Sequence, residues 1–163
     1  MDKEEILKEI KKTKEHLANM EKMLGEHNKR WKPKYDDRYY YVSEECTAME
    51  SRAWTEYIVD EHYRRYNVFK TEEEAKQEAE KILIRRQLED IARRLDKGEK
   101  IDWHNKEQPK YSIRFNYYPG KIVLDRCFRQ QALGVVYCLD KNFLDVAITK
   151  IGEERLKACL RGE

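Results

Sequence analysis

The stretch from Asn67 to Ala75, which reads NVFKTEEEA, constrains the fold more than any other part of this chain. It begins with an apolar pair, Val68 and Phe69, of the kind that favours a β-strand. Thr71 follows, and Glu74 comes three residues later. This spacing is typical of a capping box, in which each side chain accepts a hydrogen bond from the backbone N–H of the other residue. The sequence therefore predicts a strand that turns directly into a long helix.

The predicted helix runs from Glu72 to about Leu95 and carries two apolar stripes. The first stripe consists of Ala75, Ala79 and Ile82, and the second consists of Ile84, Leu88, Ile91 and Leu95. At about 100° per residue, the two stripes point about half a turn apart. The first half of the helix is therefore expected to cover a sheet, and the second half to pack against another helix. Asp96-Lys97-Gly98 is expected to end it.

Another long helix is predicted over residues 2–25, with Asp2 as its cap and Gly25 as its stop. Its apolar positions follow the spacing of a narrow heptad seam: Ile6, Ile10, Thr13, Leu17, Met20 and Leu24. A single seam on a solvated helix needs a partner. The second stripe of the long helix is the expected partner within the chain, and a homodimeric coiled coil is the alternative. The sequence leaves both open.

Six short segments are predicted to be strands, because aromatic and β-branched residues dominate them or alternate with polar residues. They are residues 39–42, 48–55 (centred on Trp54), 63–69, 111–117, 121–128 and 134–139. Tyr118-Pro119-Gly120 is expected to form a tight hairpin turn. A last helical region begins at Asp140 and is interrupted at Gly152.

These elements predict an α+β fold, with an N-terminal coiled-coil-like helix (1–27) followed by two βββα units (28–98 and 99–163). Each unit is expected to be an antiparallel sheet covered by its own helix, and residues 28–163 are expected to form one compact domain. Whether the two sheets join is left open.

Composition excludes several classes of protein. The 34 Lys and Arg residues nearly balance 32 Asp and Glu residues, whereas a dedicated duplex-binding protein usually shows a marked basic excess. No segment approaches the roughly 20 apolar residues that cross a bilayer, and the charged N-terminus lacks the apolar core of a signal peptide. We therefore expect a protein of the cytoplasm that does not contact membranes. Its four scattered cysteines are expected to be reduced thiols.

No arrangement of residues predicts catalysis. Asp60-Glu61-His62 and Asp102-Trp103-His104 place carboxylates beside imidazoles, but neither has the spacing of a zinc site or a catalytic triad. The glycines are dispersed, so there is no loop to hold a phosphate. We expect no catalytic residue, no metal and no cofactor.

Tyrosines and arginines form two basic-aromatic groupings, one around residues 38–41 and 64–66 and one around residues 110–121. Such side chains stack on bases and neutralise phosphates, but they also dominate protein–protein hot spots. The alternative is that the tyrosines fill the core while the charges are merely solvated. The candidate binding residues are Trp54, Tyr57, Arg64, Arg65, Tyr66, Arg114, Tyr117, Tyr118 and Lys121.

Four motifs in a fixed order resemble a family of small proteins encoded by phages and prophages of Gram-positive bacteria. They are W-K-P followed by Y-Y (from Trp31), N-x-F-K-T-x-E-E-A (from Asn67), D-W with a later K-Y (from Asp102) and G-E-E-R-L-K (from Gly152). The resemblance spans most of residues 31–160. It implies a phage origin and an action on host machinery, including immune systems.

Three functions follow as hypotheses. The first is a non-enzymatic phage accessory protein that binds and inhibits a host protein, such as a CRISPR nuclease. The second is a module that binds nucleic acid or nucleotides through a basic-aromatic sheet face. The third is a structural protein that assembles through the N-terminal helix.

Overall fold

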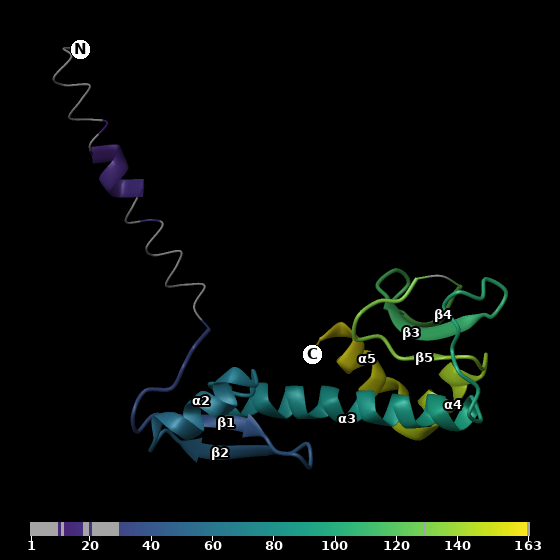
Figure 1. Cartoon of the computed structure of the whole chain (residues 1–163), viewed down its shortest axis with the longest axis horizontal. Coiled ribbons are helices and arrows are strands. Elements are labelled where there is room, and N and C mark those ends of the chain that lie inside the picture. Colours follow the sequence, from purple (N-terminus) through teal and green to yellow (C-terminus); the bar gives the residue numbers. More distant parts are fainter. Residues whose placement is uncertain (1–9, 11, 18–19, 21–29, 129, 163) are drawn as a thin grey trace.

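The computed structural model describes residues 10, 12–17, 20, 30–128 and 130–162. The described part is a mixed α and β structure with two small antiparallel sheets. Figure 1 shows two lobes placed along one long helix, α3 (Glu72–Leu95). The first lobe contains β1 (Arg38–Val42), β2 (Ala48–Arg52) and α2 (Glu56–Arg64). The second contains β3 (Lys110–Asn116), β4 (Lys121–Cys127), β5 (Tyr137–Cys138), α4 (Phe143–Ile151) and α5 (Glu153–Arg161).

The start of α3 forms as the sequence predicts. The Glu74 N–H donates to the Thr71 hydroxyl at 3.2 Å, and the Thr71 N–H donates to the Glu74 carboxylate at 3.2 Å, so the capping box is complete. The helix ends at Leu95, and Lys97 and Gly98 then take positive φ values of 51° and 88°. A non-glycine residue such as Lys97 rarely adopts a positive φ. The helix cannot continue through two successive residues with positive φ, so the chain leaves the helix axis here.

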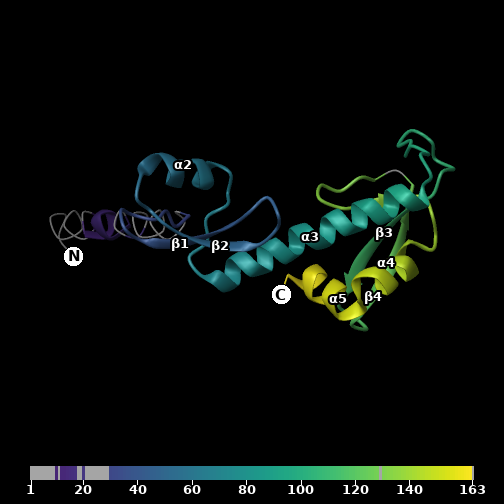
Figure 2. The same ribbon diagram turned by 90° about the horizontal axis from the view of Figure 1, so that it is seen from below.

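The first lobe is a two-stranded sheet held between two helices. Strands β1 and β2 pair antiparallel, and α2 and α3 lie on opposite sides of them (Figure 2). On the α2 side, Tyr39 is fully buried in a cluster with Ala53, Val59 and Val68. On the other side, the first turns of α3 bury Ala75 and Ala79. The expectation that the first half of α3 covers a sheet is therefore confirmed.

The prediction of a third strand over residues 63–69 is wrong. Helix α2 extends to Arg64, and only Phe69 makes a backbone bridge to β1, at Tyr40. Beside this bridge, the Asn67 side-chain amide makes the hydrogen bonds that a neighbouring strand would make. It accepts from the Val42 N–H and donates to the Val42 carbonyl, both at 2.7 Å.

The aromatic and β-branched residues after Trp54 follow a helical pattern instead. Val59 and Tyr63 lie four residues apart on α2, and both pack on the cluster around Tyr39. Strand β2 correspondingly ends at Arg52, so Trp54 lies outside it. The first unit is therefore not βββα, because α2 takes the first two residues of the predicted third strand and only Phe69 of the remainder bridges to β1.

The second apolar stripe of α3 packs inside the second lobe. Ile84, Leu88 and Ile91 are buried with Ile113, Cys138, Phe143, Ala147, Ile151 and Leu156, and Leu95 packs at the edge. The prediction that this stripe packs on the N-terminal helix is wrong, because β3, β5, α4 and α5 already cover it. In the N-terminal segment, Ile10, Leu17 and Met20 are helical and exposed, while Ile6 and Leu24 lie outside the described residues. The homodimer remains a prediction.

The second sheet has the strand order β4-β3-β5 and does not continue the first sheet. Its β3–β4 hairpin and the turn at 118–120 agree with the sequence prediction. The last strand is shorter than the expected 134–139, because only Tyr137 and Cys138 pair with β3. The Cys138 thiol and the Leu139 N–H both donate to the Asp96 carboxylate, at 3.1 and 2.8 Å, which fixes this strand to the end of α3.

Shortening Ile84 tests the packing of α3 in the second lobe. Ile84 is 1% exposed, so Ile84→Ala should lower the free energy of unfolding by about 2–5 kcal/mol through lost burial and a residual cavity. Arg85→Ala, one residue along the same helix but exposed, should change it by less than about 0.5 kcal/mol. Urea denaturation measures both, and equal effects would contradict the assigned core.

Candidate functional site

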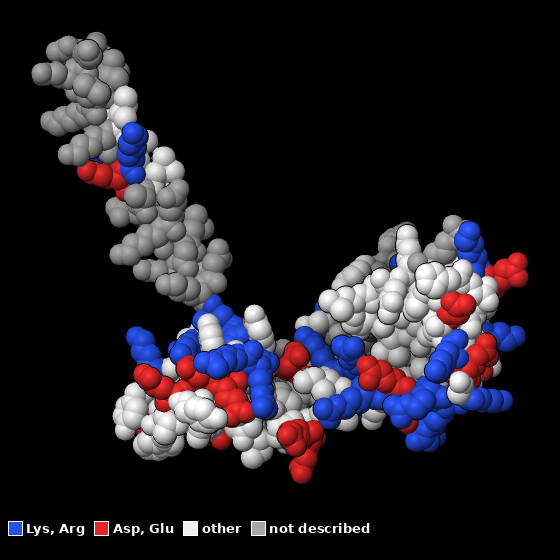
Figure 3. All heavy atoms as spheres, viewed as in Figure 1, with Lys and Arg blue, Asp and Glu red and all other residues white. Residues whose placement is uncertain are grey.

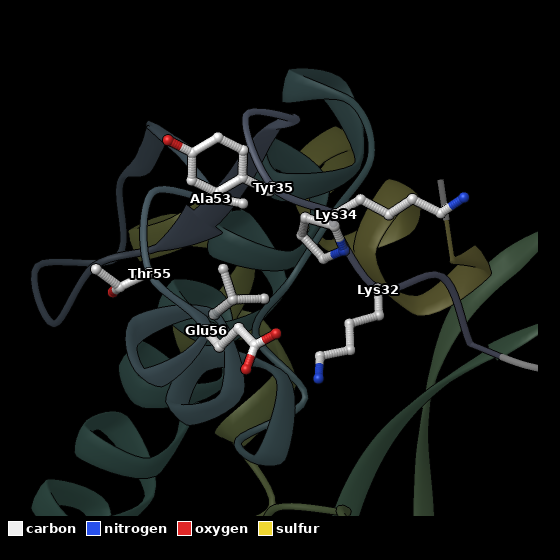
Figure 4. Close-up of a pocket in the computed structure, with 8 residues that line it drawn as sticks. Lys32, Lys34, Tyr35, Ala53, Thr55 and Glu56 are labelled. Atoms are coloured by element: carbon white, nitrogen blue, oxygen red, sulfur yellow. The ribbon is translucent and has the colours of Figure 1, made fainter.

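A hollow of about 370 Å³ lies between the loop before β1 and the start of α2 (Figure 4). We call it the rim hollow. It is lined by Lys32, Pro33, Lys34, Tyr35, Ala53, Thr55, Glu56 and Val59. Two backbone hydrogen bonds hold its walls together, since the Asp36 N–H donates to the Ala53 carbonyl at 3.1 Å and the Ala53 N–H donates to the Asp37 carbonyl at 3.0 Å.

The loop that forms one wall is fixed by its own polar contacts. The Asp37 carboxylate accepts from the Lys34 N–H at 2.8 Å. Asp36 takes a positive φ of 67° and pairs with Arg52 of β2 at 3.3 Å. Because Pro33 cannot continue a helix, the chain enters this turn directly from the connector. The rim hollow is therefore largely preformed.

The floor of the rim hollow is apolar and its margin is charged. Ala53 and Val59 are buried, whereas the Lys32 ammonium forms an ion pair with Asp60 at 2.5 Å. The hydrogen bond from Lys32 lowers the pKa of Asp60, and the same bond raises the pKa of Lys32. In the view of Figure 4, Lys32 and Glu56 lie at one end of the hollow and the Tyr35 ring at the other.

Three large aromatic side chains are exposed on the segments that form the rim hollow. Tyr35 is 78% exposed, Trp54 60% and Tyr57 78%. Tyr35 lines the hollow, Trp54 sits between the lining residues Ala53 and Thr55, and Tyr57 follows Glu56 on the first turn of α2. We call these three residues the aromatic rim. Exposed aromatic rings beside an apolar depression are typical of a surface that binds another protein.

Tyrosines beneath this surface hold α2 on the sheet. The Tyr39 hydroxyl lies 3.1 Å from His62 Nδ1, and the Tyr41 ring stacks on His62 with 4.4 Å between ring centroids. At the end of α2, the Arg30 guanidinium lies over the rings of Tyr63 and Tyr66, at 3.6 and 4.4 Å from their centroids. These contacts tie the connector and the sheet to α2.

The remaining candidates in the first lobe lie at the C-terminal end of α2. Arg64 is its last residue and Arg65 is its C-cap, and Arg65 forms an ion pair with Glu61 at 2.6 Å. Tyr66 is exposed and takes a positive φ of 58°. These residues lie on a helix end and not on the expected sheet face.

The second grouping lies on the other lobe. Tyr117 and Tyr118 are exposed at the β3–β4 turn, with Lys121 exposed at the start of β4. Tyr117 packs edge-on against Phe115, with ring centroids 5.1 Å apart. Arg114 of β3 pairs with Asp125 of β4 at 3.3 Å. Since α3, about 36 Å long, joins the two lobes, the two groupings do not form one continuous face.

Three of the six basic side chains in these groupings form ion pairs with acidic side chains. Arg38 pairs with Glu50 at 3.6 Å, in addition to the pairs of Arg65 and Arg114. Lys110 is fully buried, and its ammonium donates to the Asn105 and Phe128 carbonyls at 2.8 and 3.2 Å. Figure 3 shows acidic and basic side chains interspersed over both lobes. This arrangement favours a protein ligand over a phosphate backbone.

The described residues show no group of three or more His, Cys, Asp and Glu side chains that could hold a metal ion. The four cysteines are free thiols. His104 belongs to a local turn, in which its N–H donates to the Asp102 carboxylate at 2.8 Å. None of the helices in the described ranges is long and apolar enough to cross a membrane.

No family model matches this chain, and no match was found among curated proteins or solved structures.

Sequence reasoning identified two of the three residues of the aromatic rim and missed Tyr35. The available signal was its place two residues after Pro33, in a polar connector where a tyrosine has no core to fill. The rim hollow itself had no sequence signal, because its walls are brought together by backbone bonds from Ala53 to Asp36 and Asp37, which are 17 and 16 positions away in the sequence.

His62 should make the stability of the first lobe depend on pH. Burial lowers the pKa of His62; Glu61 opposes this shift and Arg65 adds to it. The folded state therefore binds the proton less readily than the unfolded chain, whose histidine pKa is about 6.5. The stability that neutral His62 contributes is present above that pH and is lost as pH falls below it.

The comparison with His62→Gln isolates this effect. The variant keeps a polar side chain but does not titrate, so its free energy of unfolding should fall less than that of the wild type between pH 7 and pH 5. Urea denaturation at each pH measures the difference. The carboxylates of Asp60 and Glu154, whose pKa values are also lowered, titrate equally in both proteins. Parallel pH profiles would contradict the assignment.

Proposed function

We propose that this protein binds a partner protein through the aromatic rim and the rim hollow. The observation that carries the proposal is the set of three exposed aromatic side chains on the segments that form an apolar-floored hollow. Tyr and Trp give large contact areas at little cost in conformational entropy, and they dominate the binding energy of many interfaces. The hollow has room for one side chain of the partner, while Lys32 and Glu56 at its margin offer polar contacts.

We further propose that the partner is a host protein and that binding inhibits it. The support is the resemblance of the W-K-P, N-x-F-K-T-x-E-E-A, D-W and G-E-E-R-L-K motifs to phage and prophage proteins. A protein of this kind acts by occluding its target, so a binding surface is sufficient and catalysis is not needed. A component of bacterial defence, such as a CRISPR nuclease, is the target class that we propose.

A pull-down from a lysate of a Gram-positive host, with and without nuclease treatment, tests this function. A stoichiometric host protein should be retained after nuclease treatment. Trp54→Ala and Tyr57→Ala should each reduce its retention about tenfold or more, because each removes an exposed ring. Tyr118→Ala, which removes an equally exposed ring from the other lobe, is the matched control and should retain the partner.

The free energies of unfolding of Trp54→Ala and Tyr57→Ala should stay within about 0.5 kcal/mol of the wild type, since both side chains are exposed. This separates a loss of binding from a loss of folding. Retention that is unchanged in both variants would exclude the aromatic rim as the binding surface.

A nucleic-acid or nucleotide ligand is the second candidate function. The observation that favours it is the exposed hairpin tip of the second lobe, where Tyr117 and Tyr118 stand beside Lys121. Rings of this kind stack on single-stranded bases. Binding of a fluorescent single-stranded oligonucleotide should then weaken steeply with added salt, because bound counterions are released. It should be lost in Tyr118→Ala and kept in Trp54→Ala.

Assembly through the N-terminal helix is the third candidate, and the exposed positions of Ile10, Leu17 and Met20 favour it. If the chain assembles through this helix, sedimentation should show an assembly for the whole chain and a monomer for a variant with charged residues at Ile10 and Leu17.

A further inference from the structure

Strand β2 is an exposed edge of the first sheet. The sheet contains only β1 and β2. The far side of β1 is satisfied, since Tyr40 exchanges backbone hydrogen bonds with Phe69 at 3.0 and 2.8 Å and Val42 pairs with the Asn67 side chain. Among the described residues, none pairs with the far side of β2. Its sequence, AMESR, contains no proline, and its charged residues are Glu50 and Arg52.

The register shows which backbone groups of β2 face outward. In an antiparallel pair, opposed residues alternate between exchanging hydrogen bonds and facing away. Backbone bonds join Ser43 to Thr47 at one end of the pair and Asp37 to Ala53 at the other, at 2.9 and 3.0 Å. With the register fixed, Met49 and Ser51 bond to β1, and Ala48, Glu50 and Arg52 face away from it.

These outward groups are available for another strand. The Arg52 carbonyl already accepts from the Trp54 N–H at 2.9 Å. The N–H and C=O groups of Ala48 and Glu50 make no hydrogen bond within the described ranges of the chain. Unpaired groups in this alternating arrangement are the template that an added β-strand recognises.

A second hollow, of about 550 Å³, lies beside this edge, and we call it the edge hollow. Cys46, Thr47 and Ala48 line one side, and Glu73, Lys76, Gln77, Ala79 and Glu80 of α3 line the other. Ala48 and Ala79 have small side chains, which leaves space between the strand and the helix. A groove between an edge strand and a helix accommodates an extended peptide, with backbone pairing on the strand and side chains directed toward the helix.

The lining of the edge hollow has a net negative charge, because it contains Glu73, Glu80 and Lys76. The Lys76 ammonium is paired with Glu72 at 2.7 Å, and Glu80 is paired with Arg155 at 2.6 Å. The Glu50 carboxylate of β2 is paired with Arg38 at 3.6 Å. Among the described residues the Glu73 carboxylate has no ion pair, so a ligand with a Lys or Arg side chain is complementary to it.

We infer that the β2 edge and the edge hollow bind an extended segment of a partner protein that carries Lys or Arg, by addition of a strand to the sheet. This inference rests on the proposed function, since it names how a protein partner is held. The partner residue opposite Ala48 enters the edge hollow, because paired residues share a face of the sheet. The next residue lies beside Met49, which is 44% exposed on the other face.

A second copy of this chain is the alternative occupant. Pairing two β2 strands antiparallel with Glu50 opposite Glu50 would place like charges on opposed strands, which is destabilising. A shift of two residues would instead place Glu50 opposite Arg52 of the other copy. The net negative charge of the edge hollow favours a basic segment of a different protein, and hydrogen exchange without peptide distinguishes the two occupants.

Selection of random 12-residue peptides, displayed on phage, against the immobilised full-length protein tests the inference. Enriched peptides should alternate Lys or Arg with apolar residues. Their affinity should fall about tenfold or more in Glu50→Pro, which lacks the outward N–H, relative to Glu50→Gln, which keeps it. Glu73→Lys should weaken them by about threefold or more, because it reverses the charge at the edge hollow.

Amide hydrogen exchange of the wild-type protein gives a readout that does not depend on a variant folding. A synthetic copy of an enriched peptide should slow exchange at Ala48, Glu50 and Arg52 and leave Met49 and Ser51 unchanged, since the latter already bond to β1. Slowed exchange that depends on protein concentration without peptide would overturn the inference in favour of a second copy. Failure to enrich peptides, or equal binding to Glu50→Pro and Glu50→Gln, would also overturn it.

These outcomes are distinct from failure of the proposed function. A host protein that is retained through Trp54 and Tyr57, with no selected peptide at β2, would keep the function and reject the edge. Selected peptides that protect β2, together with a lysate partner insensitive to Trp54→Ala and Tyr57→Ala, would keep the edge and reject the aromatic rim.

Discussion

The structure depends on one helix that serves two cores. The capping box at Thr71 and Glu74 fixes where α3 begins, because it satisfies backbone donors that the first turn otherwise leaves unpaired. From that point the phase of the helix is set. Ala75 and Ala79 face the first sheet, while Ile84, Leu88 and Ile91 face the second lobe. A shift of one residue at the cap would rotate both stripes by about 100° and separate both cores from their partners.

This arrangement explains why the two lobes differ in what they expose. The second lobe surrounds the end of α3 with four elements and buries its apolar side chains well. The first lobe has a two-stranded sheet, which is marginal without packing against helices. It is stabilised by α2, by the His62–Tyr39 contact and by the Asn67 amide that pairs with Val42. Its small size leaves the aromatic rim and the β2 edge uncovered, so the proposed binding features belong to the same lobe.

Local patterns predicted the elements whose stability comes from nearby residues. The α3 boundaries, the β3–β4 hairpin and strand β1 form as expected, because caps, turn residues and alternation act over a few positions. Helix α2 was missed because its aromatic residues have high strand propensity, and only the packing of Val59 and Tyr63 on Tyr39 decides in favour of a helix. Trp54 and Tyr57 could be proposed from residue type alone. Tyr35 and the two hollows depend on backbone contacts between distant segments.

The sequence by itself determined the α+β class and the start and phase of α3. Periodicity and capping chemistry encode these properties locally. Only the tertiary structure decided that the two apolar stripes of α3 serve different lobes, that Tyr39 and Lys110 are buried while Tyr35 and Tyr57 are exposed, and that β2 is an open edge. Burial and edge position are set by which segments meet, and a single sequence does not specify those long-range contacts.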